Sequence, residues 1–124
     1  MLLRKILLVD DDADIRLIAE ISLSSLGGWQ VVQAASGAEA LDLASRERPD
    51  LILLDVMMPG MDGPTTLEKL RELEDGQATP VIFMTAKVQK AEIDRLLSLG
   101  VRGLIPKPFD PMALPDEIRG ILGA

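Results

Sequence analysis

The chain has 124 residues, of which 48% are apolar, and this length is typical of a single domain built around one core, here residues 1–124. Its net charge of −7 opposes the basic surface that binding to nucleic-acid phosphates requires, so we expect no direct contact of this domain with DNA or RNA. Because cysteine and histidine are both absent, disulfides, thiolate or imidazole metal sites and histidine acid–base catalysis are excluded.

Five short apolar runs predict β-strands. They alternate with helix-type patterns, which predicts an α/β fold in which a parallel sheet carries helices on both faces. In chain order, the strands are expected at residues 5–9, 30–34, 51–54, 80–84 and 103–105.

The helix between the first two strands has the most extended apolar pattern. Asp12 or Asp14 is expected to cap its start, and Gly27 and Gly28 to end it. A stripe of buried side chains is predicted at Ile15, Ile18, Ala19, Ile21, Leu23 and Leu26.

The second and third helices are bounded by capping and breaking signals. The second follows the capping box Ser36-Gly37-Ala38-Glu39 and runs through Arg46. The third opens at Asp62-Gly63-Pro64, and the polar stretch 74–79 is expected to be the loop after it.

The two C-terminal helices are expected to flank the short fifth strand. Gly100 suits the end of the fourth helix. The last helix is expected over about residues 112–122, although Pro115 cannot donate a backbone hydrogen bond and shifts its start toward Leu114.

The N-terminus lacks the layout of a secretory signal, and no apolar run approaches the span that a membrane helix needs. We therefore expect a cytoplasmic protein that does not enter a membrane. The end of the chain at Ala124 fits a complete protein and equally a domain cut from a longer one.

Two of the predicted strands end in carboxylates. The first leads into Asp10, Asp11 and Asp12, and the third ends at Asp55. In a parallel sheet these acids lie at one edge, where two charges about 4 Å apart repel by roughly 4 kcal/mol at an effective dielectric near 20. We therefore expect a cation among them. The alternatives are a solvated capping loop for the first run and a structural acid for Asp55.

Two further polar side chains follow strands at the same edge. Thr85 follows the fourth strand, and Lys107 comes just after the fifth. Ligands of open parallel sheets bind outside the carboxyl ends of the strands, where the strand order reverses. A helix cap is the alternative for Thr85, and an ordinary surface lysine for Lys107.

Four segments, taken in this order, resemble the receiver domain of bacterial response regulators across essentially the whole chain. They are Val9-Asp10-Asp11, the segment 55–63, Met84-Thr85-Ala86 and Pro106-Lys107-Pro108-Phe109. The resemblance implies a doubly wound, five-stranded parallel sheet of order 2-1-3-4-5, which is the flavodoxin-like arrangement. It also implies a phosphoacceptor switch of a two-component system or phosphorelay.

The resemblance implies a role for each residue at this edge. Asp55 is the expected phosphoacceptor, and a sensor histidine kinase or histidine phosphotransfer protein is the expected donor of the phosphoryl group. The metal is expected to be Mg²⁺, held by Asp10, Asp11, Asp55 and the backbone carbonyl of Met57, with Asp10 acting largely through water. Thr85 and Lys107 are expected to contact the phosphate, and the peptide between Lys107 and Pro108 to be cis.

The implied activity is that of a signalling domain rather than a metabolic enzyme. It assists its own phosphorylation, slowly hydrolyses the product, and changes the face formed by the fourth helix, fifth strand and fifth helix, where an effector binds.

Two positions depart from the pattern of the family. Many receivers carry an aromatic residue three positions before the lysine, where this chain has Leu104, which offers no hydroxyl and less area. Met57 brings an apolar side chain near the expected path of attacking water, and we hypothesise that it modulates autodephosphorylation.

Other readings of the same residues predict different chemistry. A Mg²⁺-dependent phosphohydrolase of the haloacid-dehalogenase type requires a second Asp two residues after the nucleophile, where Met57 stands. A pseudo-receiver would bind partners without phosphorylation. A flavodoxin-like FMN protein shares the fold, but the acidic first loop would repel the phosphate of the cofactor.

Overall fold

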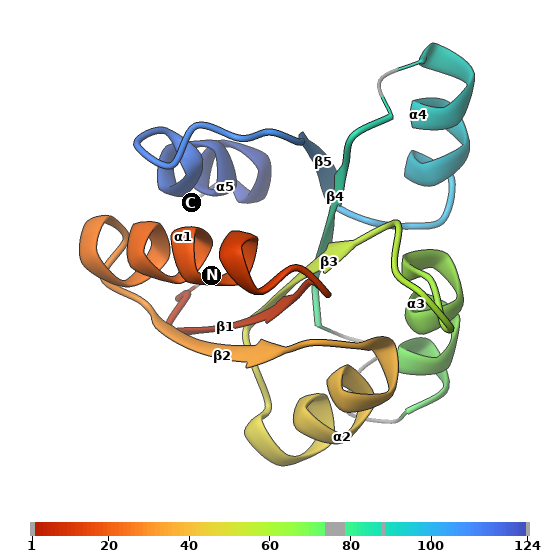
Figure 1. Ribbon diagram of the computed structural model, residues 1–124, viewed down its shortest axis with the longest axis horizontal. Coiled ribbons are helices and arrows are strands. Elements are labelled where there is room, and N and C mark those ends of the chain that lie inside the picture. The colour runs from red at the N-terminus through yellow and green to blue at the C-terminus, as the bar shows by residue number, and fades with distance from the viewer. Residues whose placement is uncertain (1, 74–78, 88, 124) are drawn as a thin grey trace.

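Five apolar segments form the parallel sheet that the sequence predicts. The computed structural model describes residues 2–73, 79–87 and 89–123 (Figure 1). The strands are β1 (Lys5–Val9), β2 (Gln30–Ala34), β3 (Leu51–Asp55), β4 (Val81–Thr85) and β5 (Gly103–Pro106). Their order is β2-β1-β3-β4-β5 with every neighbouring pair parallel, which confirms the doubly wound arrangement.

Helices cover both faces of this sheet (Figure 1). One face carries α1 (Ala13–Ile21), its π-helical continuation η1 (Ser22–Leu26) and α5 (Leu114–Leu122). The other carries α2 (Gly37–Glu47), α3 (Gly63–Glu72) and α4 (Lys90–Leu97). Within the described residues, no helix is both long enough and apolar enough to cross a membrane.

The sheet divides the expected single core into two. In β1, Ile6 and Leu8 pack on the side of α1 and α5, whereas Leu7 and Val9 pack on the side of α2, α3 and α4. All four side chains are fully buried, and burial of each large apolar side chain stabilises the fold by about 1.5–3 kcal/mol. Because both faces are covered, β1 is apolar from Ile6 to Val9, and polar residues are found at its start, Lys5, and directly after its end, Asp10.

The helix starts follow the predicted signals. Asp12, Ser36 and Asp62 each accept a hydrogen bond from a backbone N–H in the first turn of α1, α2 and α3, respectively. The last helix begins at Leu114 with Pro115 in its first turn, which confirms the later of the two starts considered.

Several element boundaries differ from the prediction by one residue. β3 includes Asp55, β4 is shifted to begin at Val81, and β5 extends to Pro106. Of the loop expected at 74–79, residues 74–78 lie outside the described residues.

The predicted stripe of the first helix is only partly buried. Ala19 and Leu23 are buried, whereas Ile18, Ile21 and Leu26 are 45%, 54% and 49% exposed. At about 100° per residue, the predicted positions span more than half of the helix circumference, which is more than the side facing the sheet can bury. The wider turns of η1 rotate the chain further. The result is an exposed apolar surface along α1.

The single tryptophan lies at the end of the sheet opposite to the acids, just before β2. Trp29 is buried, and the guanidinium carbon of Arg119 in α5 lies 4.7 Å from the centroid of its ring. Arg119 also donates a hydrogen bond of 3.2 Å to the carbonyl of Gly27. The pair therefore ties α5 to the end of η1.

Candidate functional site

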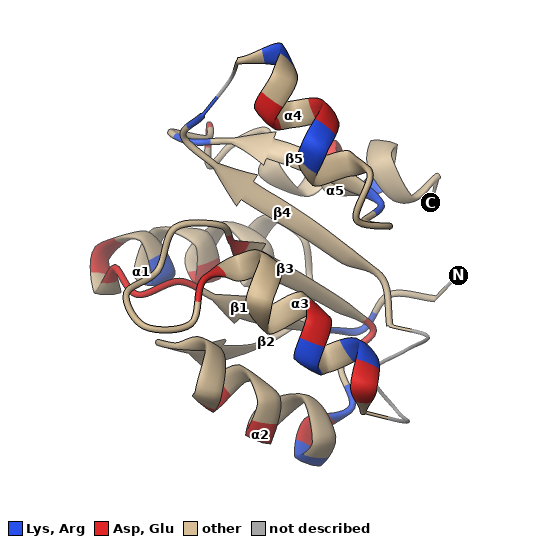
Figure 2. Cartoon of the chain, turned by 90° about the vertical axis from the view of Figure 1, so that its right-hand side faces the viewer, with Lys and Arg blue, Asp and Glu red and all other residues tan. Residues whose placement is uncertain are grey.

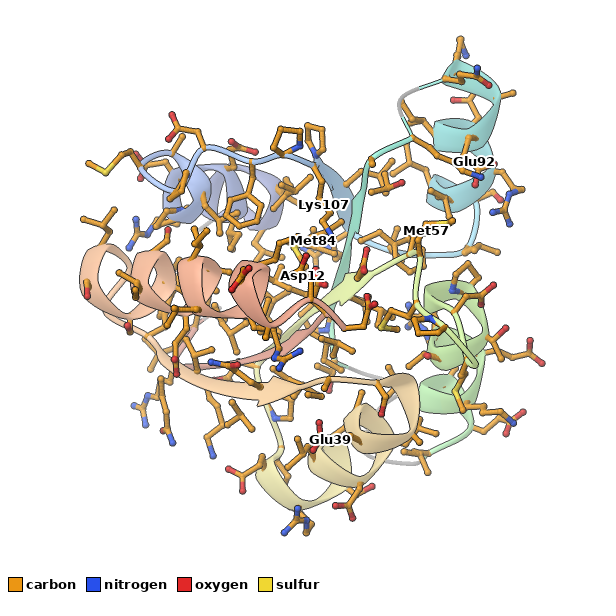
Figure 3. All side chains as sticks on the ribbon, viewed as in Figure 1. Asp12, Glu39, Met57, Met84, Glu92 and Lys107 are labelled. Atoms are coloured by element: carbon orange, nitrogen blue, oxygen red, sulfur yellow. The ribbon has the colours of Figure 1, made fainter. Side chains whose placement is uncertain are left out.

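The polar residues singled out in the sequence converge at the carboxyl edge of the sheet. Asp10 directly follows β1, Asp55 is the last residue of β3, Thr85 ends β4 and Lys107 follows β5. Figure 3 shows Lys107 beyond the end of β5, and Figure 2 shows acidic residues on the segment that leads into α1. The predicted edge is thus a single site, next to the point where the strand order reverses.

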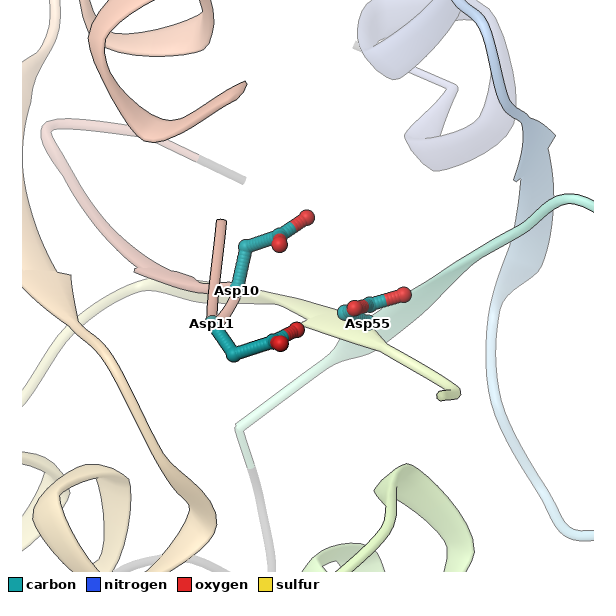
Figure 4. Close-up of side chains that lie close together, drawn as sticks. All are labelled: Asp10, Asp11 and Asp55. Carbon is teal, nitrogen blue, oxygen red and sulfur yellow. The ribbon is translucent and has the colours of Figure 1, made fainter. Parts of the chain in front are cut away.

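Three carboxylates meet at this edge. Asp10, Asp11 and Asp55 each offer an oxygen, and these oxygens lie within 4.8 Å of one another (Figure 4). Asp10 and Asp55 are buried, whereas Asp11 is exposed. Asp12 is not one of the three, because its carboxylate caps α1. Two acids of the run Asp10–Asp12 therefore belong to the site, and the third has the capping role.

Lys107 is the cation expected among the acids. Its Nζ lies 2.9 Å from Oδ2 of Asp10 and 3.3 Å from Oδ1 of Asp55. Its side chain is only 15% exposed, so the alternative of a surface lysine is wrong. The peptide between Lys107 and Pro108 is cis, as expected from the resemblance.

Burial and charge shift the protonation equilibria of this site. Burial, followed by the charge of Asp10, raises the pKa of Asp55 to about 6, although Lys107 and a backbone hydrogen bond from Met57 act in the opposite direction. Burial disfavours the ammonium of Lys107, but its hydrogen bond to Asp10 and the charges of both carboxylates outweigh burial and raise its pKa. The site thus holds a fixed positive charge beside a carboxyl group that titrates not far below neutral pH.

Thr85 is buried at the end of β4 with its hydroxyl in a defined role. Its Oγ1 accepts a hydrogen bond of 3.0 Å from the backbone N–H of Lys87, which leaves the hydroxyl proton available to donate. The backbone carbonyl of Thr85 accepts a hydrogen bond of 2.8 Å from the N–H of Lys107. Thr85 therefore connects the ends of β4 and β5.

The loop after Asp55 is anchored at both ends. Gly63 donates a backbone hydrogen bond of 2.9 Å to the carbonyl of Val56, and Asp62 caps α3. Between these anchors, Gly60 has φ of +76°, a conformation that favours glycine. The Met57 side chain is 58% exposed, and its effect on dephosphorylation stays a hypothesis. Met57 is labelled in Figure 3.

Two residues of the site had no role in it assigned from the sequence, where Arg16 was not named and Gly63 was named only at the opening of the third helix and within the segment 55–63. The side chain of Arg16 donates a hydrogen bond of 2.7 Å to the backbone carbonyl of Asp10, and Gly63 packs against the backbone of Asp55. No sequence signal marks Arg16, because its partner is a main-chain atom. A glycine directly after a capping aspartate was the available signal for Gly63.

The donor set fits a hard divalent cation. Each of the three clustered side chains offers a carboxylate oxygen, and one of them, Asp11, is accessible to solvent. Magnesium prefers ligation by oxygen atoms and retains some of its water, whereas softer metals favour nitrogen and sulfur. The acidic cluster could therefore hold a metal such as Mg²⁺.

Comparison with known proteins identifies the same kind of domain. The family model described as the response regulator receiver domain matches residues 6–119. A probable transcriptional regulator, ycf27, of Porphyridium aerugineum is 42% identical over 118 residues, which cover 95% of this chain and 48% of that protein. Sporulation initiation phosphotransferase F of Bacillus subtilis is 38% identical over 122 residues, covering 98% of this chain and 96% of that protein.

A solved structure agrees with these relatives. The receiver domain of the sensor histidine kinase PA1611 from Pseudomonas aeruginosa, with a magnesium ion coordinated in its active-site cleft, superposes with a TM-score of 0.85. It is 31% identical, and the match covers 99% of this chain and 100% of that one. The chain spans about half the length of the first regulators that it matches. The family match, the strand order and the converging acids show that this chain belongs to the response regulator receiver domain family.

Proposed function

We propose that this protein is a phosphoacceptor switch in which Asp55 receives a phosphoryl group from a phosphohistidine of a sensor histidine kinase or histidine phosphotransfer protein. One observation carries the proposal. The carboxylate of Asp55 is buried at the end of β3, lies 3.3 Å from the ammonium of Lys107, and shares an oxygen cluster with Asp10 and Asp11. This arrangement places a nucleophile among groups that can neutralise a phosphate.

The proposed transfer is a single displacement at phosphorus. A bond forms between an Asp55 carboxylate oxygen and phosphorus while the bond from phosphorus to the imidazole nitrogen of the donor breaks, and the imidazole keeps the electron pair. Asp10, Asp11, Asp55 and the carbonyl of Met57 would hold Mg²⁺, which when bound offsets the repulsion between carboxylate and phosphate. Acetyl phosphate could serve as a small donor in the same way.

Lys107 and Thr85 would then bind the transferred group. The ammonium already sits beside Asp55, so it can pair with one phosphate oxygen with little movement. The oxygen of the Thr85 hydroxyl already accepts a hydrogen bond from the backbone N–H of Lys87, so the hydroxyl proton can be donated to a second phosphate oxygen. We expect the product to be hydrolysed slowly by water, so the protein assists its own chemistry without being a metabolic enzyme.

The output would pass to the face formed by α4, β5 and α5, where an effector binds. Leu104 lies in β5 at the position where many family members have an aromatic ring, and it is paired in register with the buried Phe83 of β4. Leu104 is partly buried against the core on the side of the sheet that carries α2, α3 and α4. A change in the population of the conformations of this face therefore has to occur by repacking of the aliphatic Leu104 side chain rather than by rotation of an aromatic ring.

The exposed surface of α1 is the proposed docking surface for the phosphodonor protein. Ile18 contributes to an apolar groove that also includes Phe109 and reaches Lys107 in the site. The same surface continues through Ile21 to Met112, which is 73% exposed. Since the groove is continuous with the site, an apolar helix face of the donor seated in it would bring its phosphohistidine to Asp55.

The proposal extends to the whole chain. All described strands join one sheet, which supports residues 1–124 as one receiver domain. The family supports its place in a two-component system or phosphorelay, whereas its cytoplasmic location stays a prediction from the sequence.

Formation of a beryllofluoride adduct tests the proposal. Fluorine NMR of the protein with Mg²⁺ and beryllofluoride is expected to show a bound signal that disappears without Mg²⁺ and in Asp55→Ala. Asp42→Ala removes an exposed carboxylate of α2 and should retain the signal. If folded wild-type protein that binds Mg²⁺ forms no adduct, the protein is a pseudo-receiver and Asp55 is a structural acid.

A further inference from the structure

A chain of hydrogen bonds runs from α1 through the edge strand β2 to the acidic loop. Arg16 donates from Nη1 to the backbone carbonyl of Asp10 at 2.7 Å and from Nε to Oε1 of Gln33 at 3.1 Å. Gln33 in turn donates from Nε2 to Oε2 of Glu20 at 2.8 Å. Arg16, Gln33 and Glu20 are all half-buried, so the guanidinium is held between two elements rather than free in solvent.

The carbonyl that accepts the hydrogen bond from Arg16 belongs to the peptide group between Asp10 and Asp11, two of the clustered acids. Asp10 has direct support of its own, since Oδ1 accepts from the N–H of Asp12 and Oδ2 pairs with Lys107, each at 2.9 Å. Asp11 differs, because its exposed carboxylate has no hydrogen-bond or ion-pair partner among the described residues. The direction of the Asp11 side chain is therefore set by its backbone, which Arg16 holds at the preceding carbonyl.

We infer that Arg16 is a positioning residue for the metal site, which it serves by fixing the Asp10–Asp11 peptide and hence the Asp11 carboxylate. This inference rests on the proposed function, in which Asp11 is a ligand of Mg²⁺. Gln33 and Glu20 hold the guanidinium in place, and the carboxylate of Glu20 offsets part of its charge. Residues that orient metal ligands in this way commonly change metal affinity as strongly as some ligands do.

The sign of the effect separates positioning from electrostatics. A cation close to a metal site repels the metal, so removal of the Arg16 charge alone would strengthen Mg²⁺ binding. Loss of the hydrogen bond to the Asp10 carbonyl frees the Asp11 backbone, and this loss would weaken Mg²⁺ binding. A residue that only stabilises the fold would change the free energy of unfolding and leave the affinity of the folded protein for Mg²⁺ unchanged.

The experiment is a titration of metal-free protein with Mg²⁺ at constant ionic strength, followed by ¹H–¹⁵N NMR. Arg16→Ala is expected to raise the Kd for Mg²⁺ about tenfold. Gln33→Ala should act in the same direction more weakly, and Arg16→Lys, which keeps one donor, should lie between Arg16→Ala and wild type. Arg46→Ala is the matched charge control, because Arg46 pairs with Asp42 on the exposed side of α2, and its Kd should equal that of wild type.

Backbone relaxation of the metal-free proteins gives a second readout. In Arg16→Ala, the order parameter of the Asp11 amide is expected to fall toward the flexible range, below about 0.6, while that of Arg46→Ala stays near the rigid value. An unchanged or lower Kd for Mg²⁺ in folded Arg16→Ala would overturn the inference and leave the proposed function standing. If Arg16→Ala does not fold, a wild-type Kd in both Arg16→Lys and Gln33→Ala overturns it. A wild-type protein that binds no Mg²⁺ would overturn the proposed function itself.

Discussion

Asp55 makes the stability of the metal-free protein depend on pH. Its pKa is raised to about 6 by burial and by Asp10, whereas an unfolded aspartate titrates near 3.8, so the folded state binds this proton more tightly. The stability gained from the neutral carboxyl is therefore complete below about pH 3.8 and is lost as the pH rises through about 6. Asp55→Asn, which cannot ionise, is expected to raise the free energy of unfolding at pH 7 by on the order of 2 kcal/mol.

Urea unfolding with a chelator present, carried out from about pH 4 to pH 7, measures this effect. The gain in Asp55→Asn should be small at the acid end and grow toward neutral pH. Asp42→Asn removes an exposed carboxylate and should change stability by less than about 1 kcal/mol. A gain in Asp55→Asn that is independent of pH would show that the buried charge is not its cause.

At the scale of elements, α3 approaches the end of β3 so closely that its first residue has to be glycine. A Cβ at Gly63 would lie 2.6 Å from the carbonyl oxygen of Asp55 and 2.8 Å from Cα of Val56. Gly63→Ala is therefore expected to lower the free energy of unfolding by about 1–3 kcal/mol. Gly120→Ala is the control, because Gly120 lies within α5 and a Cβ there meets nothing within 4 Å, and this substitution should raise stability by about 0.5–1 kcal/mol.

Chemical denaturation of the two variants makes the comparison. Loss of stability in both, or in neither, would contradict the close approach of α3 to β3.

The exposed surface of α1 belongs to the same scale. The double variant with Ile18→Ser and Ile21→Ser is expected to reduce phosphotransfer from a histidine kinase that phosphorylates the wild type by about tenfold, because both side chains are about half exposed in the proposed docking surface. Phosphorylation by acetyl phosphate, which needs no docking surface, should be unchanged. Leu97→Ser alters an exposed leucine of α4 and is the control. Equal losses with both donors would place the effect in the site rather than in docking.

The sequence predicts those features that depend on strands and fails where a contact involves the backbone or an uncovered surface. Fully apolar runs mark strands buried on both faces, and parallel pairing brings their ends together, which is why the acids, Thr85 and Lys107 could be placed at one edge. The periodicity of α1 marks its apolar positions but does not tell how much of the helix surface the sheet covers, so Ile18 and Ile21 were expected to be buried. The role of Arg16 depends on a main-chain carbonyl, which no residue type reveals.

At the scale of the whole molecule, the metal site joins segments that are distant in sequence. The clustered carboxylates come from the loop after β1 and from the end of β3, so the unfolded chain does not hold them together. Mg²⁺ is therefore expected to stabilise the folded state, by about 2.7 kcal/mol at a concentration of a hundred times its Kd, and to raise the Tm by several degrees. The rise should disappear in Asp11→Asn and persist in Asp14→Asn, an exposed acid outside the cluster. A rise of equal size in both would indicate a nonspecific effect of the salt.

The stacking of Trp29 with Arg119 determines what intrinsic fluorescence can detect in this protein. β2 has five residues and spans about 16 Å, so the indole lies roughly that far from the acidic edge. The emission of Trp29 should therefore report whether α5 is packed in its native position, and it can serve as a direct optical probe of unfolding. If binding of a metal or beryllofluoride is confined to the acidic edge of the sheet, a titration with either ligand is expected to leave the emission unchanged. An emission change on phosphorylation would instead measure long-range coupling along the sheet.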